Sequence, residues 1–201
     1  MSTFADLRTQ ALDYLDRPEL TDQFPLWVRL FQAKLNRLLR TGGGERQATL
    51  TPDPLTGGAA LPDDYQAWRS VVPVSRPAWP LPYAAPDVLA RERPCGPVGG
   101  IPRLFTIEGS TLFPAPVGQI ALTYYRGVSA YVDGSTADWI LIAHPDLYLY
   151  GVLTEAELYL KNDERAAMWQ AQAANALADL MSADRDARWG RARVMMAGAT
   201  P

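Results

Sequence analysis

The chain has very little of the residue types on which most metal and redox sites depend. Its 201 residues include a single cysteine, Cys95, and a single histidine, His144. One cysteine excludes an internal disulfide and any zinc site built from a cysteine cluster. One histidine leaves too few ligands for most centres made of histidine and cysteine. We therefore expect no metal and no other cofactor.

Long hydrophobic runs are also missing. No uninterrupted apolar run approaches the length of about 20 residues that a membrane helix requires. The opening MSTFADLRTQ has no basic segment followed by an apolar one, so it does not have the pattern of a signal peptide. We expect a protein that does not enter a membrane and is made in the cytoplasm.

An excess of charge of one sign is absent as well. The net charge is −3, without the strong basic excess typical of nucleic-acid binders. The basic residues are 17 arginines and only two lysines, a bias typical of a GC-rich genome. Hydrophobic residues make up 48% of the chain, which is ample for a core. This length predicts one domain, or one domain with a sizeable insertion.

The two ends of the chain have helical periodicity. Apolar residues recur at spacings of three and four in two runs within residues 2–41 and in two more within 139–183. Glycines 42–44 end the second run. Asp163 is the expected N-cap of the last one. We therefore predict a bundle of about four helices, formed by residues 1–44 and 139–183.

Residues 45–138 have a different pattern. Nearly all the prolines of the chain lie here, and Glu108-Gly109 predicts a hairpin turn. Short β-like runs lie between the turn signals at 47–51, 67–73, 103–108, 111–113 and 119–125, with a short helix at 86–91. The predicted fold is α+β: a mainly α-helical bundle with a β-rich insertion between helices 2 and 3. Residues 184–201 are expected to form an extended C-terminal tail.

The third helix of this bundle is unusually apolar. His144, Pro145 and Asp146 form its start signal, with proline at the first helical position and an acid at the positive end of the helix dipole. A helix that is apolar nearly all round must be buried on several sides. We expect part of its surface to pack against neighbouring copies of the chain. The residues that we assign to this subunit packing are Leu147, Tyr148, Tyr150, Leu153 and Tyr159.

No catalytic site emerges from the sequence. His144 and Asp146 are two positions apart, and residues at this spacing do not face each other on a helix. The same holds for Glu155 and Glu157, which we interpret as solvated charges. The expected protein is therefore not an enzyme.

The C-terminal segment combines four arginines with apolar residues. Arginine, tryptophan and methionine are enriched at protein interfaces. We expect the segment to dock onto a protein partner; the alternatives are disorder and direct contact with DNA. The proposed docking residues are Arg185, Arg188, Trp189, Arg191, Arg193, Val194, Met195 and Met196.

Several phrases, in their order and spacing, resemble the head-to-tail adaptor (connector or head-completion) proteins of tailed bacteriophages and gene transfer agents. The most specific is WILIAHPDLYLYGVLTEA at 139–156, followed by a Lys-x-Asp-Glu-Arg corner at 161–165. The other phrases are FADLRTQALDYLDRPEL at 4–20, ERQATLT at 45–51, LPDDY at 61–65 and the proline-led strands of 100–126. The Pro-rich connection at 73–98 departs from the pattern.

The resemblance implies a structural protein of the virion, at the head-tail interface. Adaptors of this kind form a ring, usually of about twelve copies, in which each subunit uses two different faces. The ring binds the portal protein above and a tail or nozzle protein below. DNA passes through it without sequence-specific binding when the genome is ejected, and the C-terminal segment docks onto the portal. The alternative is a small DNA-binding module that uses the Arg-rich tail.

Overall fold

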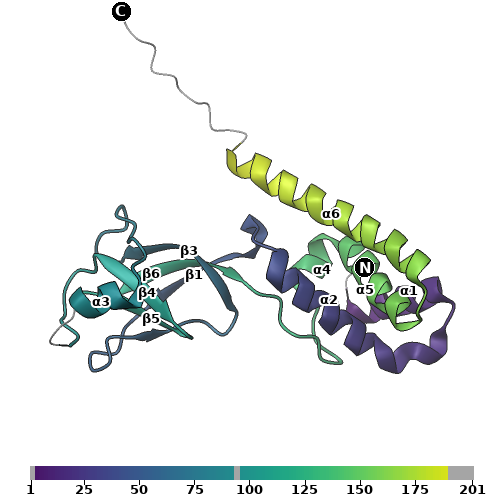
Figure 1. Cartoon of the computed structure of the whole chain (residues 1–201), viewed down its shortest axis with the longest axis horizontal. Coiled ribbons are helices and arrows are strands. Elements are labelled where there is room, and N and C mark those ends of the chain that lie inside the picture. The colour runs from purple at the N-terminus through teal and green to yellow at the C-terminus, as the bar shows by residue number, and fades with distance from the viewer. Residues whose placement is uncertain (1–2, 93–95, 190–201) are drawn as a thin grey trace, which may run out of the picture. The chain divides into compact units, whose positions relative to one another are not determined.

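The computed structural model describes residues 3–92 and 96–189, with side chains as far as residue 187. These residues form two compact units (Figure 1). The helical unit is built from the chain segments 1–43 and 128–201, and the β unit from residues 44–127. Along the chain, the β unit is thus inserted into the helical unit.

The helical unit begins with a helix whose N-terminus is capped. Thr3 caps it, because its hydroxyl accepts from Asp6 N at 3.1 Å while the Asp6 carboxylate accepts from Thr3 N at 3.2 Å. A 3₁₀ turn at Pro18–Gln23 then leads to the second helix. The α-helices of this unit are α1 (Phe4–Leu15), α2 (Phe24–Leu38), α4 (Trp139–Ala143), α5 (Pro145–Tyr159) and α6 (Asp163–Trp189).

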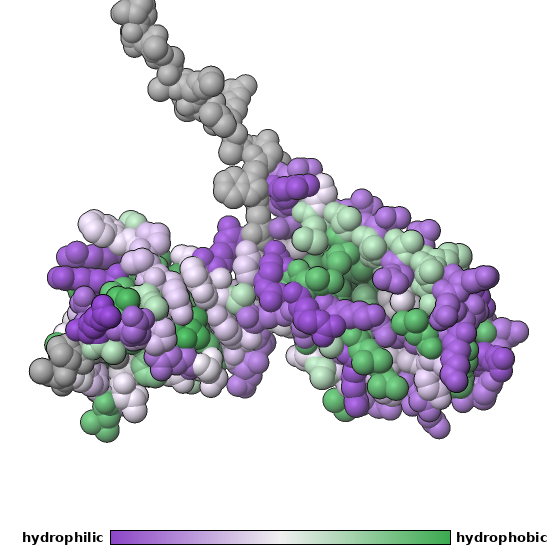
Figure 2. Space-filling model, in the orientation of Figure 1, coloured by the Kyte–Doolittle hydropathy of each residue, from purple (hydrophilic) through white to green (hydrophobic). Residues whose placement is uncertain are grey.

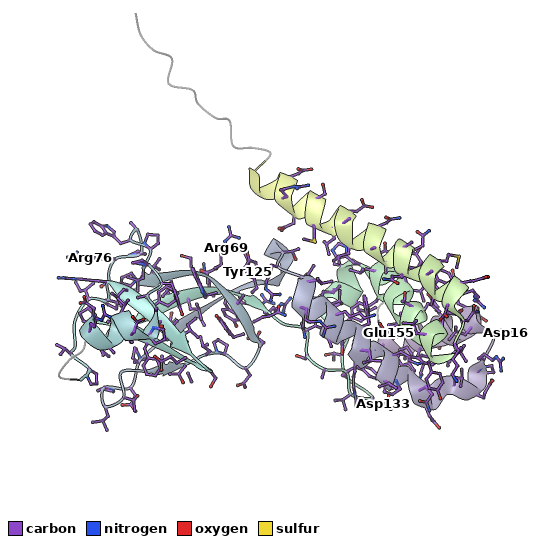
Figure 3. The ribbon with its side chains drawn as sticks, in the orientation of Figure 1. Asp16, Arg69, Arg76, Tyr125, Asp133 and Glu155 are labelled. Atoms are coloured by element: carbon purple, nitrogen blue, oxygen red, sulfur yellow. The ribbon has the colours of Figure 1, made fainter. Side chains whose placement is uncertain are left out.

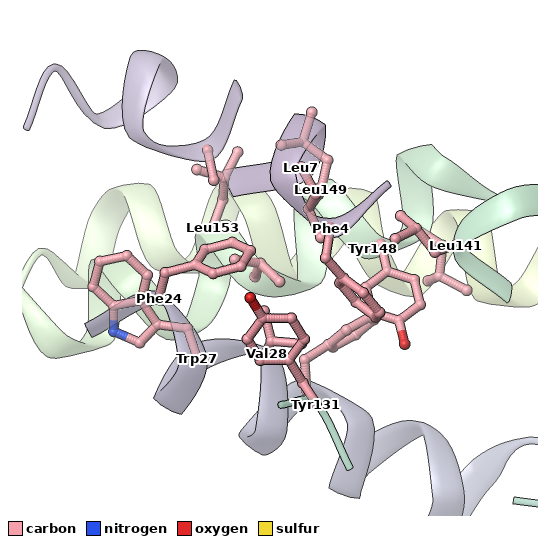
Figure 4. Packing of buried hydrophobic residues seen from close by; sticks show 14 of the residues in the cluster. Phe4, Leu7, Phe24, Trp27, Val28, Tyr131, Leu141, Tyr148, Leu149 and Leu153 are labelled. Carbon is pink, nitrogen blue, oxygen red and sulfur yellow. The ribbon is translucent and has the colours of Figure 1, made fainter. Parts of the chain in front are cut away.

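Helix α5 lies at the centre of this unit and packs against α1, α2, α4 and α6. Its buried side chains meet aromatic rings from α1 and α2 (Figure 4). Phe31 and Phe4 both contact Tyr148 edge-on, with ring centroids at 5.3 and 5.9 Å. At Gly151 a Cβ would come within 2.1 Å of the Phe31 ring, so only glycine allows α2 to pack this close to α5.

The fold prediction is wrong in its helix count. The described residues form six α-helices and two three-stranded antiparallel sheets, which makes a mixed α+β fold rather than a mainly helical bundle of about four. The apolar residues just before α5 form a separate helix, α4, capped by the Asp138 side chain. It is separate from α5 because His144 between them has φ −136° and ψ 66°, outside the helical region.

The end of the bundle also differs from the prediction. Helix α6 runs to Trp189, six residues beyond the expected boundary at 183, so the extended tail cannot begin at residue 184. Asp184 is tied into the unit, because its carboxylate accepts from Gly42 N at 2.6 Å. At the other end of α6, Arg165 N donates to the Asn162 side chain at 3.4 Å. Asn162, and not Asp163, is therefore the capping residue.

The β unit consists of two antiparallel sheets and one helix. Gly109 (φ 58°) makes the predicted hairpin between β4 and β5. One sheet has the order β1-β6-β3 and the other β2-β5-β4. The elements are β1 (Glu45–Leu50), β2 (Ala59–Ala60), β3 (Tyr65–Pro73), α3 (Pro86–Glu92), β4 (Leu104–Glu108), β5 (Thr111–Ala115) and β6 (Ile120–Arg126).

The two ends of the insertion lie side by side. Its first and last strands pair, with Glu45 opposite Tyr125. On the helical side, the Asn36 amide holds the returning chain with two hydrogen bonds, donating to Val128 O at 2.9 Å and accepting from Val128 N at 2.7 Å. Adjacent ends explain how a helical unit can accommodate a whole β unit, because domains tolerate insertions whose termini are close together.

Candidate functional site

The start of α5 gathers the three residues that the sequence assigned to a helix start. His144 is the N-cap residue, Pro145 is in the first turn and Asp146 is the acid of that turn. The His144 side chain makes no capping hydrogen bond. Among the described residues, no group of three histidine, cysteine, aspartate or glutamate side chains could hold a metal ion. These three residues therefore form the start of α5.

Most of the side chains proposed for subunit packing lie inside the chain's own core. Leu147, Tyr148 and Leu153 are buried between α5 and its neighbours. Tyr150 is half-buried and stacks on Trp169 of α6 at 5.8 Å. Only Tyr159 is exposed, at 49%. The apolar surface of α5 is therefore covered mostly within one chain, by the other helices of its own unit.

A polar cluster at the centre of this core was not foreseen. Gln32 Nε2 donates to Tyr148 Oη at 3.2 Å, and Gln32 Oε1 accepts from Tyr131 N at 2.8 Å. The Tyr148 hydroxyl in turn donates to the carboxylate of Asp138. Burial and this carboxylate raise the pKa of Tyr148 far above its ordinary value. The cluster ties α2 and α5 to the cap of α4, and the Asp138 before an apolar run was its one sequence signal.

Two buried carboxylates on α5 overturn the interpretation of Glu155 and Glu157 as solvated charges. Glu157 is 1% exposed and pairs with Arg165 Nε at 2.9 Å, while Glu155 pairs with Lys34 of α2. A buried carboxylate is stable only when it is paired. These pairs tie α5 to α6 and to α2, and Figure 3 shows Glu155 among the helices. They are structural, and their burial depends on tertiary packing that spacing alone does not give.

The helical unit has an apolar groove of about 250 Å³ between α2, α5 and α6, which we call the α2–α6 groove. Phe31, Leu35 and Leu38 line one side, and Ala173 and Leu177 of α6 line the other. Leu38 is 57% exposed at its mouth. Figure 2 shows hydrophobic side chains gathered in this region.

A second apolar surface lies at the other end of α2. Leu26 and Leu30 are one helical turn apart, and both are nearly half exposed. We call this pair the α2 ridge. The helical unit therefore presents two different apolar surfaces, to which different side chains of α2 contribute.

The docking residues proposed for the C-terminal segment fall into two groups. Arg185 is exposed on α6, between Asp184 and Asp186, and Arg188 and Trp189 belong to the last turn of that helix. This part of the segment is helical and not extended. The others lie outside the described residues: Arg191, Arg193, Val194, Met195 and Met196.

The β unit has a hollow of about 600 Å³ at the side of its sheets. Loops 73–82 and 100–103 form its walls. In the part of the chain that the structure describes, no helix is long and apolar enough to cross a membrane.

Comparison with known proteins assigns the chain to one family. A family model described as SU10 adaptor protein matches residues 2–196, nearly the whole sequence. No curated protein matches the chain in sequence. The family match confirms the resemblance to phage head-to-tail adaptors. Proteins of this family are structural adaptors of phage virions.

Proposed function

Because the chain belongs to the SU10 adaptor protein family, we propose that it forms a ring that joins the portal to the tail and gives DNA a passage between them. The family match over residues 2–196 is the observation that carries this function. The ring form, the portal contact and the DNA passage are the parts that go beyond family membership. Each has its own support and its own test.

The two apolar surfaces of the helical unit support a ring. A closed ring of identical subunits needs two different surfaces on each copy, one for each neighbour. The α2–α6 groove and the α2 ridge are two such surfaces. Apolar side chains that are half exposed in one chain gain free energy when a second copy covers them, about 25 cal/mol for each Å² removed from water. In this proposal the α2 ridge of one copy enters the α2–α6 groove of the next.

Portal docking is assigned to residues 190–201. This segment follows α6 directly and carries Arg191, Arg193, Val194, Met195 and Met196. Methionine adapts to irregular grooves, and arginine is enriched at interfaces. Because α6 continues to Trp189, we confine the proposed docking segment to residues 190–201.

The DNA passage requires no sequence readout. A net charge of −3 suits a channel that must release DNA, because cationic walls would bind its phosphates. No observation favours the alternative, a DNA-binding module built on the Arg-rich segment. Arg185, the one arginine of that segment whose side chain is described, lies between two aspartates on α6.

The portal contact can be tested by removing residues 190–201. The truncated chain keeps all of α6 and the Asp184–Gly42 hydrogen bond, so we expect it to fold with an unchanged melting temperature. Full-length protein should bind purified portal, and the truncated chain should lose this binding. A matched control replaces the same residues with a glycine-serine segment of equal length, which should also fail to bind. Normal joining by either variant would contradict the docking role.

A further inference from the structure

The hollow of the β unit is built from prolines and has two arginines among its lining residues. Five prolines line it, at positions 73, 80, 82, 102 and 116, together with Trp79, Leu81 and Ile101. Trp79 is 67% exposed and Ile101 is 42% exposed. We call it the proline hollow. Its volume of about 600 Å³ is within the range of sites that bind small molecules or a few side chains of a partner.

Backbone hydrogen bonds fix both walls of the proline hollow. Loop 73–82 is tied to β3 by Leu81 N, which donates to Val71 O at 2.7 Å, and to β4 by Phe105 N, which donates to Pro82 O at 3.1 Å. The opposite wall is held by Gly100 N donating to Val117 O at 2.9 Å. At Gly118 a Cβ would lie 2.3 Å from Gly100 O, so this close approach of the two backbones requires glycine. The hollow is therefore preformed, which lowers the entropic cost of binding.

The polar groups around the proline hollow have one sign. Arg76 and Arg103 line it, and both are exposed. Neither forms an ion pair or a side-chain hydrogen bond with any described residue. No acidic side chain among the described residues lines the hollow; Glu92 lines a smaller neighbouring hollow, to which Arg103 also contributes. Figure 3 shows Arg76 projecting from its loop.

From this combination we infer that the proline hollow binds an extended protein segment with a carboxylate next to apolar side chains. Apolar side chains of the segment would fill the space over Trp79 and Ile101, and its carboxylate would bind the guanidinium groups of Arg76 and Arg103. In the proposed ring, the partner is the tail protein that follows the adaptor. The name of this partner rests on the proposed function, whereas the chemistry of the site does not.

Charge and composition favour a protein segment over a nucleic acid. Residues 44–127 contain seven arginines and seven acidic residues, so the unit has no basic excess for a phosphate backbone. The hollow is lined mainly by prolines and other apolar residues, whereas nucleic-acid sites are polar and strongly basic. An exposed tryptophan between prolines is typical of a surface that recognises a protein.

The test uses the full-length chain and two sets of synthetic peptides. In one set, aspartate stands among leucine, phenylalanine and proline; in the other, lysine replaces each aspartate. We expect saturable binding of aspartate peptides, weak or no binding of lysine peptides, and no competition by a short DNA duplex. No saturable binding of the aspartate set, equal binding of both sets, or displacement by the duplex would overturn the inference.

Matched variants locate the binding on the protein. Reversing both charges with Arg76→Glu and Arg103→Glu should lower the affinity for the aspartate peptides by about tenfold or more. The control Arg91→Glu changes an exposed arginine of α3 outside the hollow and should leave binding unchanged. Trp79→Ala should weaken binding, while Leu55→Ala, which removes an exposed side chain elsewhere in the unit, should not. Equal effects of test and control variants would place the site elsewhere.

Portal binding by the same variants separates this inference from the proposed function. The variants should join the portal as the unaltered chain does, because the hollow lies in the β unit and the docking segment does not. If the unaltered chain binds the peptides but does not join the portal, the inference about the proline hollow stands and the proposed ring is refuted. If it joins the portal but does not bind the peptides, the proposed ring stands and the inference about the hollow is refuted.

Discussion

Both units have apolar side chains at the surface, but among the residues that the structure describes only the helical unit buries charged ones. In the helical unit, Gln32, Glu155 and Glu157 are buried and each has a partner. In the β unit, Trp79 and Ile101 face solvent around a preformed hollow. Buried polar groups that are paired favour one rigid arrangement. Exposed apolar groups on a fixed scaffold favour recognition. The helical unit therefore combines a rigid core with the α2–α6 groove and the α2 ridge at its surface, whereas the proposed recognition surface of the β unit is the proline hollow.

The largest expected effect tests whether the two units are separate in stability. Leu153→Asp puts an unpaired charge into the helical core, and Leu122→Asp does so in the β core; both leucines are fully buried. Each should cost about 4 kcal/mol or more. Hydrogen exchange should show lost protection only in the unit that carries the change. The β unit can persist alone because β1 and β6 pair at its ends.

The helical unit should stay folded when Leu122→Asp unfolds the β unit, because closing a longer loop costs little extra entropy. The unfolded insertion is then a long flexible loop of the helical unit. Loss of protection in both units from either single change would show that they unfold together, and that the two units are not separate in stability.

A smaller loss of stability is expected from breaking one tyrosine–aspartate hydrogen bond in each unit. Tyr148→Phe removes the donor to Asp138 in the helical core and should cost about 1–3 kcal/mol, because buried polar groups lose a partner. Tyr124→Phe removes the hydrogen bond to Asp64, 2.8 Å long, near the surface of the β unit, and should cost about 1 kcal/mol. Urea unfolding measures both values. Tyr83→Phe, at a half-exposed ring, is the control and should cost nothing measurable. Equal costs for the two pairs would remove the contrast between them.

The same tyrosines predict how stability depends on pH. Burial and the neighbouring Asp64 raise the pKa of Tyr124 to about 12 from the ordinary 10. The unfolded chain therefore loses this proton first as the pH rises. The stabilisation is complete below pH 10 and is lost as the pH approaches 12. Melting temperatures should fall across this window, and more gradually in Tyr124→Phe. An identical slope in the variant would contradict the assignment.

Local sequence signals predict much of the secondary structure. The hairpin at Glu108-Gly109, the strand near 119–125 and the start of α5 at Pro145 each depend on neighbouring residues, and all lie close to the positions expected. The separation of α4 from α5 was missed because one non-helical residue, His144, makes the break. The length of α6 was missed because the sequence alone did not place Asp184 against Gly42.

The candidate site was harder to predict because it depends on contacts between distant segments. The apolar character of α5 looked like a surplus for neighbouring copies, yet Leu147, Tyr148 and Leu153 are covered by helices of the same chain. Glu155 and Glu157 looked solvated, since their partners Lys34 and Arg165 are set by packing. The proline hollow joins two loops some twenty residues apart, which no local pattern connects.

The central claim is that the chain forms a ring on the portal. The most direct test is a native mass measurement of the full-length chain mixed with its purified portal. We predict a closed ring of adaptor copies on the portal. Leu38→Glu, at the mouth of the α2–α6 groove, should abolish the ring without changing the melting temperature, because this side chain is exposed in the single chain. Val132→Glu, at an equally exposed apolar position outside both surfaces, should leave the ring intact. A portal that stays bare with the unaltered chain, or a normal ring with Leu38→Glu, would contradict the account.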